Sequence, residues 1–210
     1  MKSDLYHSQK AMDKFIGDTM IDISGRGYLS TIYYYIIDSK ERTRVKVKNF
    51  LHNQLAKPDY QVFNLAMDFA KKYPDYDERI IAILHWVWAN ITYLSDNKNF
   101  KKVEYWATAR ETLDKRLGDC DDINSLIYVL ARLSGIQNAQ IWAMIGDTEV
   151  GGHFWLTYFS LKTDKWYYID GTFYPNFKKI SKGRPEFVFN KHKYQNIWCM
   201  FNDKFSYRGR

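Results

Sequence analysis

Cysteine, proline and long apolar runs are scarce in this sequence of 210 residues, and each scarcity excludes a class of protein. Its two cysteines, Cys120 and Cys199, are too few and too far apart for a disulfide framework or a CxxC zinc site, so we expect two free thiols. No apolar run approaches the roughly 20 residues of a membrane-spanning helix. The opening residues, MKSDLYHSQKAMDKF, lack the apolar stretch of a secretory signal. We therefore predict a cytoplasmic protein with no membrane partner.

Apolar and aromatic residues are abundant, at 46% and 18% of the chain, which is typical of a globular domain with a substantial core. The net charge of +7 is concentrated in residues 176–210, which hold nine Lys or Arg and two acids. This basic tail is either a solvated surface segment or an electrostatic footprint for an acidic partner such as nucleic acid. No recognised nucleic-acid motif occurs, which favours the first interpretation without excluding the second.

The texture of the sequence changes twice, which divides the chain into three parts. The division is residues 1–58 as an N-terminal extension, 59–175 as the core, and 176–210 as a basic extension packed on the core. In the first part, residues 8–20 have the pattern of a short helix. Two β-branched or alternating runs, 28–37 and 42–50, predict a hairpin.

Inside the core, a helical period comes first and a strand period follows. Apolar residues at helical spacing predict helices over 60–73, 77–91 and 108–115, and a strongly amphipathic helix that starts near Gly118. Short aromatic runs at 139–146, 153–161 and 165–173 are typical of strands, and the KTD between the last two suits a tight hairpin. Helices first and strands afterwards predict an α+β fold, with the amphipathic helix on an antiparallel sheet.

The segment GDCDD places Cys120 at the start of that amphipathic helix. A helix N-terminus lowers a thiol pKa, whereas the flanking Asp119 and Asp121 raise it. A nucleophilic cysteine here needs a base that becomes cationic beside it, and His153, at the start of a strand after two glycines, can serve. The KTD hairpin returns Asp170 to the same end as His153, where it can orient the imidazole. Cys120, His153 and Asp170 are thus a candidate acyl-transfer triad.

Three blocks in order carry a resemblance to a known family. They are ERIIAILHWVWANITYLSD, WATARETLDKRLGDCDDINSLIYVLARLSGIQNAQIWAMIG and GGHFWLTYFSLKTDKWYYIDGTF. Together they resemble the transglutaminase-like superfamily of papain-related thiol enzymes. The acidic GDCDD is more similar to bacterial and phage transglutaminase-like cysteine proteinases than to animal transglutaminases, which indicates a bacterial or phage origin. The third block departs from the family by having Gly171 after the aspartate, where proline is usual.

The resemblance assigns the nucleophile to Cys120, the base to His153 and the orienting carboxylate to Asp170. It also implies an oxyanion hole formed by the Cys120 backbone N–H and by Trp106. We expect no cofactor, but the resemblance leaves open that Asp119 and Asp121 hold calcium, as flanking acids do in some members.

Aromatic residues near the triad are candidates for substrate binding. We predict that Trp142 and Trp155 line a substrate cleft, although strand alternation would place some of these aromatics in the core.

The function that follows is a thiol-dependent acyl transfer on protein or peptide amides through a cysteine thioester, with hydrolysis favoured. A protein cross-linking transglutaminase is the first alternative, because the sequence does not identify the acyl acceptor. A non-catalytic binding module that uses the basic tail is the second.

Overall fold

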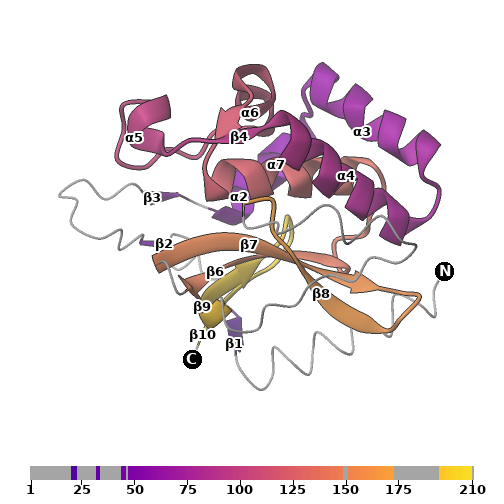
Figure 1. Ribbon diagram of the computed structural model, residues 1–210. Helices are drawn as coiled ribbons and strands as arrows, with labels where there is room; N and C mark the ends of the chain where they lie inside the picture. The colour runs from indigo at the N-terminus through magenta and orange to yellow at the C-terminus, as the bar shows by residue number, and fades with distance from the viewer. Residues whose placement is uncertain are drawn as a thin grey trace.

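The computed structural model describes residues 20–22, 32–33, 44–45, 47–148, 151–172 and 194–209. Its main sheet is built from β1 (Met20–Asp22), β6 (Ile141–Thr148), β7 (Gly151–Ser160), β8 (Lys165–Ile169), β9 (Tyr194–Phe201) and β10 (Ser206–Gly209). These six strands are all antiparallel, in the order β1-β10-β9-β6-β7-β8. Figure 1 shows the helices gathered on one face of the sheet. The predicted α+β fold, with an antiparallel sheet and helices on it, is confirmed.

The helix layer is arranged around one central helix. It contains α2 (Val47–Ala56), α3 (Tyr60–Lys72), α4 (Tyr76–Asn90), α5 (Asp96–Asn99), α6 (Ala109–Lys115) and α7 (Cys120–Leu133). α7 contacts β7 on one side and α2, α3, α4 and α6 on the others. Its apolar residues Ile123, Leu126, Ile127 and Leu130 are buried and Leu133 is partly buried, which explains why the helix forms where the period of 3.6 residues indicated. None of the described helices is long and apolar enough to cross a membrane.

Two short pairs of strands lie outside the main sheet. β2 (Ile32–Tyr33) pairs antiparallel with β3 (Arg44–Val45), as the predicted hairpin requires. β4 (Thr92–Tyr93) pairs parallel with β5 (Leu117–Gly118) and thereby brings the end of α4 beside the start of α7. The predicted helix over 8–20 lies outside the described residues, except that Met20 begins β1.

One strand prediction was wrong. The run 42–50 was expected to be a strand throughout, but the chain becomes helical at Val47. Alternation in RTRVKVKNF ends there because Phe50, Leu51 and Leu55 follow a helical period instead. Leu51 is completely buried in the core, so tertiary packing decides in favour of the helix.

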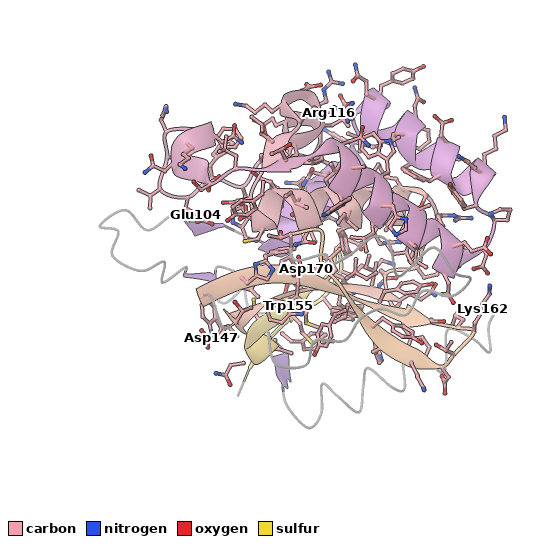
Figure 2. All side chains as sticks on the ribbon, in the orientation of Figure 1. Glu104, Arg116, Asp147, Trp155, Lys162 and Asp170 are labelled. Atoms are coloured by element: carbon pink, nitrogen blue, oxygen red, sulfur yellow. The ribbon has the colours of Figure 1, made fainter. Side chains whose placement is uncertain are left out.

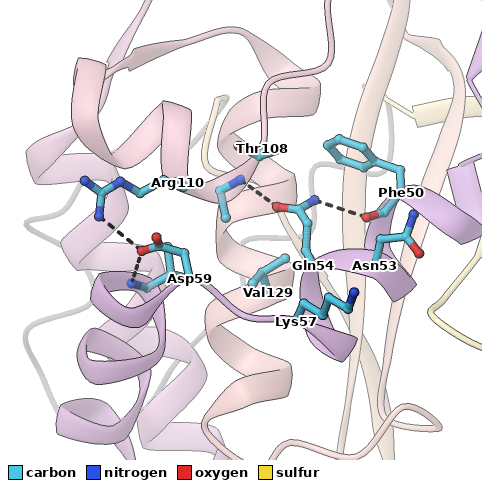
Figure 3. A pocket seen from close by; sticks show the side chains of 10 residues that line it. Phe50, Asn53, Gln54, Lys57, Asp59, Thr108, Arg110 and Val129 are labelled. Atoms are coloured by element: carbon cyan, nitrogen blue, oxygen red, sulfur yellow. Dashed lines mark hydrogen bonds and ion pairs between the residues drawn. The ribbon is translucent and has the colours of Figure 1, made fainter.

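A pocket of about 380 Å³ separates α2 from the starts of α3 and α6 (Figure 3). Gln54 bridges it, since its amide donates to the Phe50 carbonyl and accepts from the Ala109 backbone N–H at 2.6 Å. On the rim, Arg110 forms an ion pair with Asp59 at 3.1 Å. The Gln54 bond connects α2, and the Arg110 ion pair connects the N-cap of α3, to the first turn of α6. The pocket lies along α7, at Val129, rather than at the N-terminal end of that helix.

The turn between β9 and β10 is anchored to α7 by a buried polar cluster. The Asp203 carboxylate accepts hydrogen bonds from the Tyr128 hydroxyl at 2.7 Å and from Arg132 Nε at 2.9 Å. Burial by itself would raise the pKa of Asp203, but the Arg132 bond and charge hold that pKa below its ordinary value. Residues beyond the predicted core therefore support the central helix.

Candidate active site

The start of α7 is set by close contacts between backbone segments. Leu94 N–H donates to the Gly118 carbonyl at 2.9 Å, which continues the pairing of β4 with β5. A Cβ on Gly118 would lie 2.6 Å from Cβ of Asp122, so only glycine lets this strand approach the helix so closely. Cys120, the first residue of α7, is left half-buried at this junction.

The hairpin of β7 and β8 brings His153 and Asp170 together as predicted. Leu156 lies opposite Ile169 in the register, so the chain just beyond Ile169 runs beside the start of β7. Nε2 of His153 lies 2.7 Å from Oδ2 of Asp170, and both side chains are buried. The other Asp170 oxygen accepts from the Thr172 backbone N–H at 2.9 Å, which fixes the carboxylate plane.

The Cys120 thiol lies beside the start of β7. The backbone N–H of Phe154, the residue after His153, hydrogen-bonds to the thiol, and the Asp170 charge acts on it. Burial raises the pKa of the Cys120 thiol well above its ordinary value, and the charge of Asp119 raises it further. Without a cationic neighbour the cysteine is therefore a neutral thiol, as the flanking acids indicated.

Carboxylates gather beside the thiol from three segments of the chain. Oxygens of Asp96, Asp119 and Asp122 lie within 4.8 Å of one another. Burial raises the pKa of Asp96 to about 7 and that of Asp122 to about 8, and the charge of Asp119 adds to both. Burial is also the main cause that raises the pKa of Glu104, which is labelled in Figure 2, to about 7.

The composition of this acidic cluster fits a hard divalent cation. Oδ1 of Asp96 and Oδ1 of Asp119 are buried and have no hydrogen-bond partner among the described residues. Carboxylate oxygens are the ligands that Ca²⁺ prefers, and unsatisfied buried acceptors are costly unless a cation or donor meets them. The predicted partner of Asp119 was Asp121, whereas this set joins Asp119 to Asp96 and Asp122. The predicted pair of Asp119 and Asp121 also lies together, with the Cys120 sulfur, and Oδ2 of Asp121 is likewise buried without a hydrogen-bond partner among the described residues.

The indole N–H of Trp106 already has an acceptor. The ring packs edge-on against Phe154, with centroids 5.4 Å apart. Its Nε1–H donates to Glu104 at 2.9 Å, so donation to an oxyanion requires a change of acceptor. The role of Trp106 in an oxyanion hole stays a prediction.

Trp142 and Trp155 do not lie on the wall of a cleft. They are 1% and 0% exposed and form a core cluster with Met144 and Met200, on the sheet face that α7 does not cover. Strand alternation is the cause, because Phe154 and Leu156 face α7 and Trp155 must point the other way. Trp155 instead stacks against the His153 ring, with an interplanar angle of 14°.

Two residues at the site, Asn124 and Asp96, were not predicted from the sequence. Asn124 lies one turn after Cys120, inside an otherwise apolar stripe, and that interruption was the available signal. Asp96 comes from α5, outside any motif around the cysteine, and only the pairing of β4 with β5 brings it near. No local pattern indicated it.

The chain is similar to a known family in sequence and to known structures in fold. Residues 64–171 match the family model of the transglutaminase-like superfamily. No curated protein matches the chain significantly by sequence. A structure of LapG from Legionella pneumophila is 12% identical, with a TM-score of 0.53, and the match covers 77% of this chain and 85% of LapG. The structure of EGTA-treated LapG is also 12% identical, with a TM-score of 0.52, and the match covers 77% of this chain and 84% of LapG. These likenesses show a common fold.

Proposed function

The chain belongs to the transglutaminase-like superfamily, and from this membership and the site geometry we propose a thiol-dependent enzyme that hydrolyses amides of a protein or peptide. Cys120 is its nucleophile, His153 its general base and Asp170 the group that orients the base. The aspartates around the cysteine support hydrolysis over cross-linking, because that form resembles the bacterial and phage proteinases.

The proposed reaction has two half-reactions. Nδ1 of His153 takes the thiol proton, the Cys120 sulfur bonds to the amide carbonyl carbon, and the C–N bond breaks as the imidazolium gives its proton to the leaving amine. Water then attacks the thioester, loses a proton to the same imidazole and releases the acid, and that proton returns to the sulfur. The Cys120 backbone N–H, which has no intrahelical acceptor at the first position of α7, donates to the oxyanion, with Trp106 as a second proposed donor.

The observation that carries the proposal is the buried pair of His153 and Asp170 beside the thiol. Nε2 of His153 lies 2.7 Å from the Asp170 carboxylate. We propose that this carboxylate accepts the Nε2–H, so that Nδ1 is the atom that receives the thiol proton. The ion pair so formed would offset the burial and the acidic charges that raise the thiol pKa.

We also propose that Asp96, Asp119 and Asp122 hold a divalent cation such as calcium. The buried oxygens without partners support this assignment, and the backbone bonds from Ala107 and Asp119 to Asp122 hold that carboxylate in place. A bound cation supplies positive charge next to the thiol, and the three carboxylates orient around it.

Calcium should stabilise the protein, and more so as the pH rises. The pKa values of Asp96 and Asp122 are raised to about 7 and about 8 in the folded state. Without calcium, in EGTA, the protonated carboxyl groups of Asp96 and Asp122 stabilise the folded state fully at a pH below their ordinary pKa. This stabilisation is lost as pH rises from about 4 to about 8. Calcium at 100 times its Kd should add about 2.7 kcal/mol to the free energy of unfolding.

Thermal unfolding with and without calcium, between pH 5 and 8, measures this effect. Asp96→Asn should abolish the calcium response, while the exposed Asp114→Asn on α6 should keep it. An equal response in both variants would remove Asp96 from the site.

The enzyme proposal is tested by alkylation of Cys120 with iodoacetamide at pH 6 to 7, with mass spectrometry to assign the site. Cys120 should react faster than a model thiol, and His153→Ala should abolish that advantage. Cys199 is an internal control, because burial raises its thiol pKa and it is 3% exposed. Equal rates in wild type and His153→Ala would contradict the proposal.

The acyl acceptor is tested separately with a labelled primary amine and casein. Release of peptides without incorporation of the amine supports hydrolysis. Incorporation of the amine without cleavage would replace it with cross-linking.

A further inference from the structure

Asn124 is a polar residue in a position that burial would normally reserve for an apolar one. It is completely buried on α7, four residues or about one turn after Cys120. It lies between the apolar residues Ile123 and Leu126 in the sequence. An amide is costly to bury unless its donors and acceptor are all satisfied. Its contacts therefore indicate what keeps it there.

The Asn124 amide connects all three segments of the proposed triad. Nδ2 donates to the Cys120 carbonyl at 3.0 Å and to the Phe154 carbonyl at 2.8 Å, and it lies 3.3 Å from Oδ1 of Asp170. Oδ1 of Asn124 accepts from the Gly171 backbone N–H at 2.9 Å. The two hydrogens of this amide thus connect the helix of Cys120, the strand of His153 and the Asp170 carboxylate.

Gly171 provides the backbone N–H that donates to the oxygen of the Asn124 amide. A Cβ on Gly171 would lie 2.5 Å from Cγ2 of Ile123 and 2.7 Å from Cδ1 of Ile127. Glycine therefore lets the segment just after β8 approach α7 this closely without moving those side chains. Its free N–H reaches Asn124, a bond that proline at this position could not make. The glycine that departs from the family pattern thus has a partner on the nucleophile helix.

We propose that Asn124 is a positioning residue that sets the Asp170 carboxylate and the His153 strand relative to Cys120, with Gly171 as its complement. This inference rests on the proposed function for its catalytic consequence, although the placement of Asp170 can be tested without it. With Thr172 N–H and Asn124 Nδ2 on one oxygen of Asp170, the other oxygen faces His153 Nε2. Loss of the amide frees the carboxylate to rotate and loosens β8 from α7.

The test compares two changes at Asn124 with a matched change at its neighbour. Asn124→Ala removes the amide, and the isosteric Asn124→Asp keeps the volume but replaces the donor with an acceptor. Ser125→Ala is the control, because Ser125 is equally buried on α7 and its hydroxyl has no hydrogen bond among the described residues. All variants are made in the full chain, and their folded fraction is measured by circular dichroism before each assay.

Two measurements are made on the folded fraction. The first is the NMR signal of the His153 Nε2–H, protected from exchange by Asp170 in the wild type. The second is the pH profile of Cys120 alkylation by iodoacetamide. We expect both Asn124 variants to lose the protected signal and to slow alkylation at pH 6.5 by about tenfold, equivalent to about 1.4 kcal/mol. In Asn124→Asp the deficit should grow as the new carboxyl ionises beside Asp170. Ser125→Ala should match the wild type in both.

Each outcome decides the inference. If folded Asn124→Asp keeps the protected signal and the wild-type pH profile, Asn124 is only structural and the inference is overturned. If both Asn124 variants lose the signal while wild-type alkylation proves independent of His153, the enzyme proposal fails and the positioning of Asp170 by Asn124 is upheld. Loss of the signal together with slower alkylation supports both.

Discussion

Replacing Asp170 by asparagine should lower turnover about 10⁴-fold while leaving the fold intact. The asparagine amide would donate to Nε2 of His153, where the aspartate now accepts at 2.7 Å. The imidazole proton would then move to Nδ1, and the nitrogen proposed as the general base could no longer take a proton. Hydrolysis of a chromogenic peptide anilide at saturating substrate measures kcat, and circular dichroism checks the fold.

The matched control is Asp164→Asn, in the turn of the same hairpin. Asp164 has a φ of +55°, a conformation that asparagine also adopts readily, so this change should be neutral for both fold and rate. A folded Asp170→Asn that retains more than about a tenth of wild-type kcat would show that tautomer control by Asp170 is not part of the mechanism.

Removing the Asp203 carboxylate should produce the largest loss of stability that we predict. Asp203→Ala removes this acceptor from the partly buried Arg132 charge and from the buried Tyr128 hydroxyl. Breaking a buried ion pair on one side typically costs about 3 to 5 kcal/mol. Urea unfolding at pH 7 measures the change, and the exposed Asp68→Ala on α3 is a control that should stay within about 0.5 kcal/mol of wild type.

The same pair sets a pH dependence opposite to that of the acidic cluster. The pKa of Asp203 is held below its ordinary value, so its stabilisation is present above the unfolded pKa near 3.8 and is lost as pH falls through the lower folded value. The difference between wild type and Asp203→Ala should therefore shrink in strongly acidic solution. A difference that is constant down to pH 2 would mean that packing, and not charge, accounts for the cost.

Local patterns in the sequence predicted the parts of the fold that local interactions decide. The helix after Gly118 was predicted because its apolar residues repeat at 3.6, and the strands 153–161 and 165–173 because a tight turn separates them. The juxtaposition of His153 with Asp170 follows from that turn alone. The helix at Val47 could not be predicted from alternation, because the burial of Leu51 against distant helices decides it.

Contacts between distant segments explain what the sequence did not reveal about the site. Asp96 meets Asp119 only because a two-residue parallel pair joins residues on either side of α6. Asn124 reaches Gly171 across 47 positions of sequence, and nothing near either residue encodes the other. Trp155 was misplaced because proximity to His153 in sequence does not specify which face of the sheet a side chain occupies.

The position of β9 has a consequence for the order in which the protein can mature during synthesis. β9 pairs with β6, yet it follows the hairpin of His153 and Asp170 in the sequence and lies beyond the region matched by the family model. While the ribosome has not yet released residues 194–201, β6 has an open hydrogen-bonding edge that invites pairing with other nascent chains. α7 and the hairpin of β7 and β8 are thus translated before the strand that closes the sheet. Premature termination in this interval should give aggregates rather than a smaller folded protein.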